Sequence, residues 1–187
     1  MVFELIKKCR SYRRFDNSKK ISESELRGFV ESARYTPSAA NLQRLRFALF
    51  TDDRSCDEIF SGLRFAAYLK DWDGPAESER PTAYVVITSD KELDVNLAID
   101  LGIVSEAILL TAAEAGVGGC IFRSFSSERT LPLIATKGQV IHEVIALGYP
   151  SEEVLLTDSA DGDIKYYRDA DDRHIVPKRS LDELIIK

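Results

Sequence analysis

Basic side chains that suit the binding of a phosphate gather near both ends of the chain. The first 20 residues carry seven of them, namely Lys7, Lys8, Arg10, Arg13, Arg14, Lys19 and Lys20. A second group, Arg173, Lys178 and Arg179, lies near the C-terminus. Because the planar guanidinium fork matches phosphate oxygens, the two groups predict a site for one compact anion. Solvated surface charge is the alternative, and it fits least well for Arg10 and Arg13, which flank Ser11 in a non-helical segment.

A second candidate is a segment of small side chains and amides between an expected helix and an expected strand. It reads Pro37-Ser38-Ala39-Ala40-Asn41-Leu42-Gln43. The Asn and Gln amides offer paired donors and acceptors that can match the edge of a planar heterocycle. An Asx-type turn with its polar groups in water is the alternative interpretation.

The glycine-rich run Gly116-Val117-Gly118-Gly119 resembles a phosphate loop only superficially. A P-loop requires a following Lys-Ser/Thr and a helix, and a dinucleotide fingerprint requires a helix after the glycines. Here the expected helix precedes the glycines and an expected strand follows them. We therefore interpret the run as a helix C-cap with close backbone packing.

Composition limits the class of protein. The chain has 187 residues, 44% hydrophobic and 30% charged, which predicts one globular domain over residues 1–187. A net charge of −6 argues against a bulk binder of nucleic acid or anionic membrane. Three separated cysteines and two histidines predict free thiols, no metal site and a cytoplasmic location. The N-terminal residues lack the apolar core of a signal peptide.

Apolar periodicity and β-branched runs predict helices and strands interspersed along the chain. We expect helices over residues 2–8, 22–36, 55–63 and 94–115, and strands over 46–51, 82–89, 120–122 and 140–147. The helix over 94–115 is apolar nearly all round, so we expect it to be buried on several sides, one of them against a partner subunit. Residues 71–81 read as a loop. The polar last 37 residues end in apolar Leu181, Leu184, Ile185 and Ile186, which we interpret as an arm that docks elsewhere.

Three segments in register over nearly the whole chain resemble the nitroreductase family of FMN-dependent oxidoreductases. They are Arg10-Ser11-Tyr12-Arg13-Arg14-Phe15, residues 37–43, and the long helix that runs into Gly116-Val117-Gly118-Gly119-Cys120-Ile121. Two later landmarks, Gly148-Tyr149-Pro150 and Pro177-Lys178-Arg179-Ser180-Leu181, agree with the family. The resemblance implies an α+β fold: a central, mostly antiparallel sheet flanked by helices, with a C-terminal arm that reaches the partner subunit of a homodimer.

The resemblance also implies the residues that would bind two FMN molecules at the subunit interface. Those expected at the phosphate and flavin are Arg10, Ser11, Arg13, Lys178 and Arg179. Those expected near the flavin, some across the interface, are Pro37, Ser38, Ala39, Asn41 and Gln43. Phe122, Arg123 and Ser124 match the segment whose backbone lies beside the redox nitrogen. Three departures bear on this site: Cys9 stands where a basic residue is frequent, Arg44-Leu45 replaces Pro-Trp, and Ser124 replaces glycine.

The expected activity is hydride transfer from NADH or NADPH, through the flavin, to a small oxidised acceptor such as a nitroaromatic or quinone, by a ping-pong mechanism. We expect no catalytic triad and no essential histidine, because the flavin carries the redox chemistry. Phe65, Tyr68 and Trp72 are candidates for the wall of the acceptor pocket, and core packing is the alternative for Phe65. Enone, free-flavin or dehalogenation chemistry remains open within this class. A flavin-binding redox sensor and a nucleic-acid module are the other classes; the acidic chain disfavours the latter.

Overall fold

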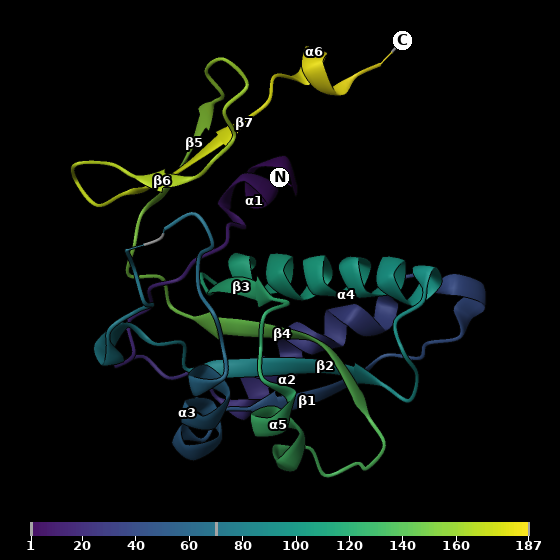
Figure 1. The fold of residues 1–187 in the computed structure, drawn as a ribbon. Helices are drawn as coiled ribbons and strands as arrows, with labels where there is room; N and C mark the ends of the chain where they lie inside the picture. The colour runs from purple at the N-terminus through teal and green to yellow at the C-terminus, as the bar shows by residue number, and fades with distance from the viewer. Residues whose placement is uncertain (1, 70, 187) are drawn as a thin grey trace.

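The computed structural model describes residues 2–69 and 71–186. Its centre is a four-stranded antiparallel sheet in the order β1-β2-β4-β3 (Figure 1). The strands are β1 (Arg46–Phe50), β2 (Ala83–Ser89), β3 (Gly118–Phe122) and β4 (Val140–Gly148). Helices cover both faces of the sheet, which confirms the α+β fold with a mostly antiparallel central sheet.

The two middle strands form the core. All seven residues of β2 are buried, as the β-branched run over residues 82–89 predicted. On one face their side chains pack under α4 (Val95–Glu114) and α2 (Glu23–Glu31), and on the other under α3 (Asp53–Ser61). The register between β2 and β4 shifts after Ile87, so that His142 has no partner residue on β2. Such a bulge redirects the side chains that follow it.

The longest helix, α4, begins at its N-cap Asp94 and ends before Gly116, whose positive φ of 78° suits a glycine. One face is buried against the sheet. The opposite face carries a row of exposed or half-exposed residues: Val95, Ile99, Gly102, Ile103, Glu106, Ala107 and Leu110. Val95 is 77% exposed and Ile99 is 56% exposed, so the N-terminal part of this face has no covering element among the described residues.

Among the described residues, α4 is also the one helix that is long and apolar enough to cross a membrane by length and composition. Its contacts with the sheet and with α2 are those of a core helix, which passes the same criterion.

Side-chain caps set the starts of the shorter helices. Ser22 and Glu25 form the predicted capping box at α2. The following residues continue as a 3₁₀ turn (Ser32–Tyr35) up to Thr36. Helix α3 starts at Asp53, two residues before the predicted Ser55. Asp52 is its N-cap, because the Asp52 side chain accepts a hydrogen bond from the Ser55 backbone N–H. The expected loop at 71–81 contains a single 3₁₀ turn, Glu77–Glu79.

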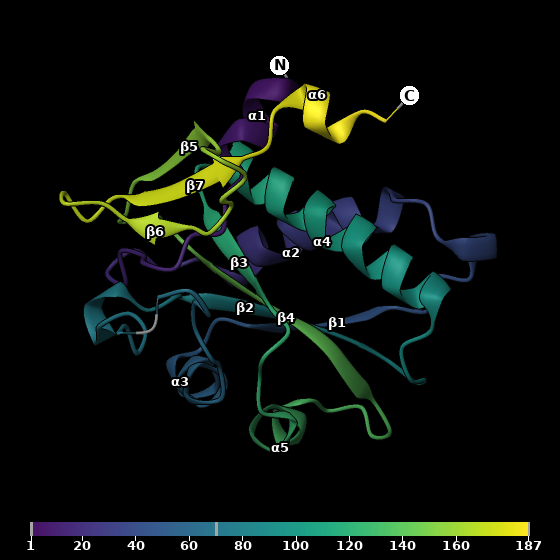
Figure 2. The same cartoon turned by 45° about the horizontal axis from the view of Figure 1, so that its top comes forward.

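The last 37 residues differ most from expectation. Instead of a plain polar tail they form a second sheet in the order β5-β7-β6 (Figure 1). Its strands are β5 (Val154–Asp158), β6 (Tyr167–Arg168) and β7 (His174–Lys178), followed by the short helix α6 (Leu181–Leu184). Figures 1 and 2 show α6 extending away from the body, and the N-terminal helix is α1 (Val2–Lys8). The apolar side chains of α6 stay exposed, and so does Ile186 beyond its end, by 93%.

Candidate functional site

The N-terminal basic loop, residues 10–15, is held between the two sheets. Ser11 bridges to Gly119 at the start of β3, and the Tyr12 backbone N–H donates to the Gly119 carbonyl at 3.0 Å. Phe15 bridges to Pro150 just after β4. A Cβ at position 118 would lie 2.5 Å from the Tyr12 ring, so glycine is required there for this approach. This confirms that the glycine run serves close backbone packing.

The two arginines that flank Ser11 point in different directions. Arg10 donates from Nη2 to the Ile6 carbonyl at 2.6 Å, at the end of α1. Its Nε is buried and has no hydrogen-bond partner among the described residues. Arg13 instead lies 4.8 Å from the centre of the Tyr166 ring and donates to the Ser11 carbonyl. The sequence predicted that both arginines bind the same anion. In the structure the guanidinium of Arg13 contacts Ser11 and Tyr166, whereas that of Arg10 keeps an unpaired Nε.

Arg13 also meets a buried histidine. Its Nη1 lies 3.1 Å from Nε2 of His174, which is 1% exposed at the start of β7. Burial, followed by the positive charge of Arg13, lowers the pKa of His174 to about 4. At pH 7 the imidazole is therefore neutral, and its Nε2 can accept a hydrogen bond from Arg13. The sequence placed His174 in a polar loop, and its structural role follows instead from strand β7.

The C-terminal basic residues are not equivalent. Arg173 is paired with Asp169 at 2.7 Å and with Asp171 at 3.2 Å, so it does not belong to a free cationic cluster. Lys178 ends β7 with an exposed side chain, and Arg179 has one long ion pair of 3.8 Å with Glu183. Lys178 and Arg179 thus keep charge available for a ligand, whereas that of Arg173 is neutralised.

The segment 37–43 forms a tight, exposed turn at the N-terminal half of α4. The Ala39 backbone N–H donates to Asp100 at 2.9 Å, and the Gln43 backbone N–H donates to the Ser38 hydroxyl at 3.2 Å. Ala40, Asn41 and Gln43 have positive φ values of 49°, 55° and 47°. Asn tolerates this left-handed backbone, but for alanine and glutamine it is unfavourable, and such strain is frequent at functional sites.

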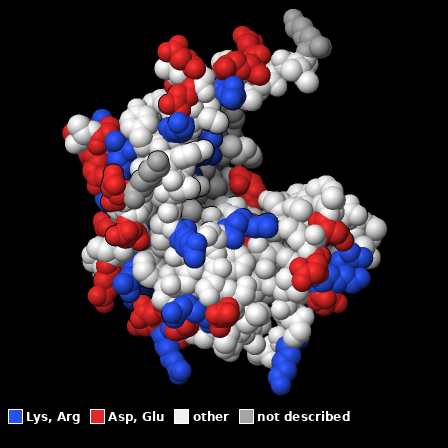
Figure 3. Space-filling view, viewed as in Figure 1, with Lys and Arg blue, Asp and Glu red and all other residues white. Residues whose placement is uncertain are grey.

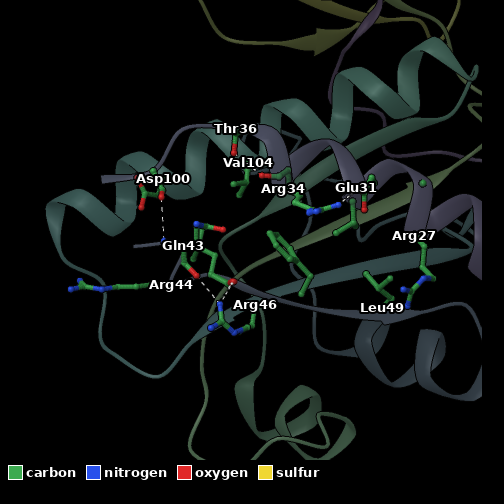
Figure 4. Close-up of a pocket in the computed structure, with 16 residues that line it drawn as sticks. Arg27, Glu31, Arg34, Thr36, Gln43, Arg44, Arg46, Leu49, Asp100 and Val104 are labelled. Carbon is green, nitrogen blue, oxygen red and sulfur yellow. Dashed lines mark hydrogen bonds and ion pairs between the residues drawn. The ribbon is translucent and has the colours of Figure 1, made fainter. Parts of the chain in front are cut away.

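Beside this turn lies a cavity of about 570 Å³ between α2, β1 and α4. Figure 4 shows the side chains that line it. Its floor is apolar, formed by Val30, Phe47, Leu49 and Val104 among others, and Ser38 and Gln43 are part of its wall. Asp100, 5% exposed, holds the turn at one end of the cavity. No local pattern of residues indicates this cavity, because its lining comes from four separate segments: α2, the 3₁₀ turn after it, the stretch from the 37–43 turn into β1, and α4.

The segment after β3 lies beside an aromatic cluster. Phe122 is buried, with its ring centre 4.9 Å from that of Phe65, and Phe65 meets Trp72 edge-on at 5.9 Å. Arg123 and Ser124 are exposed. The Trp72 ring lies between the guanidinium groups of Arg14 and Arg168, at 5.7 and 5.5 Å.

Tyr68, the other acceptor candidate, is 53% exposed and packs edge-on against Tyr166 at 5.0 Å. Trp72 thus contacts Arg14 of the basic loop and Arg168 of the C-terminal sheet, and Tyr68 contacts Tyr166 beside that sheet. A place at the acceptor remains a prediction for both.

One chain brings together only part of the predicted site. The basic loop contacts Gly118 and Gly119, beyond the C-terminal end of α4, whereas the turn at 37–43 contacts Asp100 in its N-terminal half. Arg44 beside that turn pairs with Asp94, the N-cap of α4, at 3.5 Å. A helix of 20 residues is about 30 Å long, so the two groups lie near opposite ends of that length.

Thiol and metal chemistry find no support among the described residues. Burial raises the pKa of Cys9 and of Cys120 to about 11 and that of Cys56 to about 12, which keeps the three thiols protonated at neutral pH. No group of three or more potential metal ligands comes together in the part of the chain that the structure describes.

Comparison with known proteins places this geometry in a family context. Residues 6–63 match the model of the nitroreductase family, and this stretch holds the basic loop and the turn at 37–43. A nitroreductase from Desulfovibrio desulfuricans in complex with FMN superposes with a TM-score of 0.69, at 21% identity over 100% of this chain and 95% of that chain. The chain has the nitroreductase fold. This confirms the resemblance seen in the sequence.

Other solved structures with the same fold support the match. A nitroreductase family protein from Streptococcus pneumoniae TIGR4 gives a TM-score of 0.69 at 17% identity, covering 100% of both chains. The FMN-dependent nitroreductase NfnB from Mycobacterium smegmatis, in complex with NADPH, gives 0.63 at 16% identity over 80% of this chain and 88% of that one. Comparison with curated proteins gives no significant match.

Proposed function

We propose that this nitroreductase-fold protein is an FMN-dependent oxidoreductase that transfers a hydride from NADH or NADPH to a small oxidised acceptor, such as a nitroaromatic or a quinone. The observation that carries the proposal is the set of unpaired donors around the N-terminal loop. The buried Nε of Arg10 has no partner among the described residues, and the hydroxyl of Ser11 is exposed beside it. The fold is that of neighbours solved with FMN.

These donors fit the phosphate of FMN. Guanidinium, hydroxyl and ammonium groups are the donors that proteins use for phosphate oxygens. Arg10 and Ser11 supply the first two kinds from the loop. Lys178 and Arg179 supply charge from the end of β7, which lies next to α1 in both ribbon views (Figures 1 and 2). Each charge-assisted hydrogen bond contributes on the order of 1.5–3 kcal/mol.

The flavin ring requires the turn at 37–43, and we propose that a second copy of the chain supplies it. Two α4 helices that pack antiparallel about a two-fold axis would place the turn of one chain near the basic loop of the other. The outer face of α4 is mostly apolar, with Glu106 as its one charged residue between Val95 and Leu110, and its N-terminal part, with Val95 and Ile99, is uncovered, as an interface of this kind requires.

The C-terminal segment adds to this surface. Figure 3 shows it projecting from the body, with an open notch between it and the largely uncharged surface beside α4. A capping box of Ser180 and Glu183 starts α6, while Leu181 and Leu184 remain 70% and 64% exposed. A preformed helix with uncovered apolar side chains suits an arm that docks on a partner subunit.

When bound, FMN supplies the hydride chemistry, and the protein positions the rings and sets the charge around them. In this proposal Phe122, Arg123 and Ser124 border the ring, while Tyr68 and Trp72 line the acceptor side. His142 is buried and its Nε2 lies 2.8 Å from the Ser89 hydroxyl, and His174 holds Arg13. Both histidines thus have structural partners, in keeping with chemistry that needs neither of them.

The test is anaerobic titration of the purified protein, after loading with FMN, with NADH and then with NADPH. We expect the flavin absorbance to bleach with at least one nucleotide and to return when a nitroaromatic or quinone is added. A protein that binds FMN but is bleached by neither nucleotide would be a flavin-binding protein without this activity. A protein that takes up no FMN would exclude the whole proposal.

A further inference from the structure

Glu152 joins the N-terminal basic loop to the C-terminal sheet. Its side chain is 3% exposed, four residues after the end of β4. One carboxylate oxygen, Oε1, accepts hydrogen bonds from the backbone N–H groups of two consecutive loop residues, Arg13 and Arg14, the latter at 3.0 Å. The other oxygen, Oε2, accepts from Nη2 of Arg168 on β6 at 2.6 Å. A buried carboxylate with three donors is a strong and directional connection.

The two ends of this connection are the segments that carry the predicted phosphate donors. Arg13 and Arg14 directly follow Ser11 and Arg10 in the loop. Arg168 lies on β6, which pairs with β7, the strand that leads to Lys178 and Arg179. The carboxylate thus fixes one cationic segment relative to the other, although it is too deeply buried to meet a phosphate in solvent itself.

Further contacts support the connection on both sides. Arg14 forms an ion pair with Asp172, which also receives a hydrogen bond at its carbonyl from Arg168 at 2.8 Å. The Ser151 backbone N–H donates to the Arg14 carbonyl at 3.1 Å. These contacts converge on Arg13 and Arg14, and among the described residues Glu152 is the one that bonds to both the loop backbone and β6.

We propose that Glu152 is the positioning residue of the flavin site: it sets the loop that carries Arg10 and Ser11 at the distance from Lys178 and Arg179 that one phosphate requires. This inference rests on the proposed function, and it assigns to an acidic side chain a favourable effect on the binding of an anion. Glu152 does not contact the ligand, so it acts through the loop backbone.

The sign of the effect separates this role from simple electrostatics. Glu152 carries a negative charge close to a site for a phosphate dianion, and like charges repel. Removal of that charge would therefore strengthen FMN binding if electrostatics alone decided. If positioning decides, removal loosens the loop and weakens FMN binding.

The test compares two variants with the same change in net charge. Glu152→Gln keeps the shape of the side chain and one acceptor oxygen. Its NH₂ group takes the place of Oε2, so it cannot accept the hydrogen bond from Arg168. Glu153→Gln removes the charge of the neighbouring residue, which is exposed. Glu153 accepts a hydrogen bond from the His174 backbone N–H through its backbone carbonyl, and this substitution does not change that group. FMN is added to each apoprotein, and its dissociation constant is measured by quenching of flavin fluorescence well below the melting temperature of both variants.

We expect Glu152→Gln to weaken FMN binding tenfold or more, and Glu153→Gln to leave it unchanged or slightly tighter. Backbone amide exchange adds a readout that a general loss of stability would not reproduce: the Arg13 and Arg14 amides should lose protection in Glu152→Gln while those of β2 keep theirs. Equal or tighter FMN binding by folded Glu152→Gln, compared with Glu153→Gln, would overturn the positioning role and leave the proposed function intact. Failure of the wild-type chain to bind FMN would exclude both together.

Discussion

The two halves of the proposed flavin site are built in opposite ways. The basic loop at 10–15 is held by backbone bonds to β3, by Glu152 and by the His174–Arg13 contact. The turn at 37–43 is exposed and has left-handed backbone at three positions, and one hydrogen bond to Asp100 ties it to α4. A single chain completes the first half and leaves the second open.

This difference indicates how the site would be assembled. A half that is fixed within the chain can hold the charged end of a ligand, because its donors need no further ordering. The strained, exposed turn at 37–43 is stabilised when another surface covers it. The uncovered face of α4 lies next to that turn, so partner contact and site completion would be one event.

The largest effect is expected when the two halves are kept apart. Gly102→Arg adds a long charged side chain at the middle of the uncovered α4 face, where no atom lies within 4 Å of the added Cβ. The monomer should stay folded, because glycine is a poor helix former. We expect a monomer by light scattering and at least a hundredfold weaker FMN binding. Ser24→Arg, at an exposed position of α2 outside the cavity lining, adds the same charge and should stay dimeric and keep FMN; a dimeric, flavin-bound Gly102→Arg would contradict the α4 interface.

A second variant breaks the fixed half. Gly118→Val places a Cβ 2.5 Å from the Tyr12 ring and 2.6 Å from Pro150, so the loop must move. Overpacking of this kind lowers the free energy of unfolding by about 3 kcal/mol. Chemical denaturation of the apoprotein measures this, with Gly28→Ala as a control that should be neutral or stabilising. A fully stable Gly118→Val would show that the loop is not held as tightly as described.

The fixed half should also show a pH dependence. The unfolded chain has a His174 pKa near 6.5, while the folded chain has one of about 4. Between these values the unfolded state binds the additional proton, so stability falls as the pH falls. From pH 7.5 to pH 5 the loss is about 2 kcal/mol. Unfolding curves at the two pH values for the wild type and for His174→Gln check this: the variant should lose about 2 kcal/mol less, and an equal loss would exclude the contribution of His174.

The smallest effect concerns the open half. Ala40 has φ 49° and ψ 24°, a conformation that costs alanine about 1 kcal/mol more than glycine. Ala40→Gly should therefore raise the free energy of unfolding slightly, by about 0.5 kcal/mol after the entropy cost of glycine. Ala39→Gly, in the same turn at negative φ, should lower it. If both variants lose stability alike, the turn is not strained at Ala40.

The strongly patterned parts of the fold could be predicted from the sequence. The β-branched run of β2, the capping box at Ser22 and the apolar length of α4 are local signals that directly encode their elements. The prediction that Gly118 and Gly119 serve close packing was also correct, because a Cβ at either position would clash with its neighbours. Residue types and spacing also indicated the two cationic segments and the turn at 37–43.

The C-terminal sheet could not be predicted in the same way. Its strands are short, and it is held by ion pairs such as Arg168–Glu152 and by guanidinium–aromatic contacts at Tyr166 and Trp72, which leave no apolar periodicity. Glu152 and His174 stand in a polar stretch, and only the fold brings them to the loop. The left-handed backbone at Ala40 has no residue signal either, because alanine rarely adopts it.

The central claim, that two chains complete each site, has a direct test by complementation. Arg10→Glu damages the fixed half, and Asn41→Trp blocks the open half with a side chain on an exposed position. Each variant alone should be dimeric and bind almost no FMN. After unfolding and refolding as an equal mixture, half of the dimers carry one intact site, so the FMN content should recover to about a quarter of that of the wild type. A mixture that binds no more FMN than the separate variants would contradict the claim.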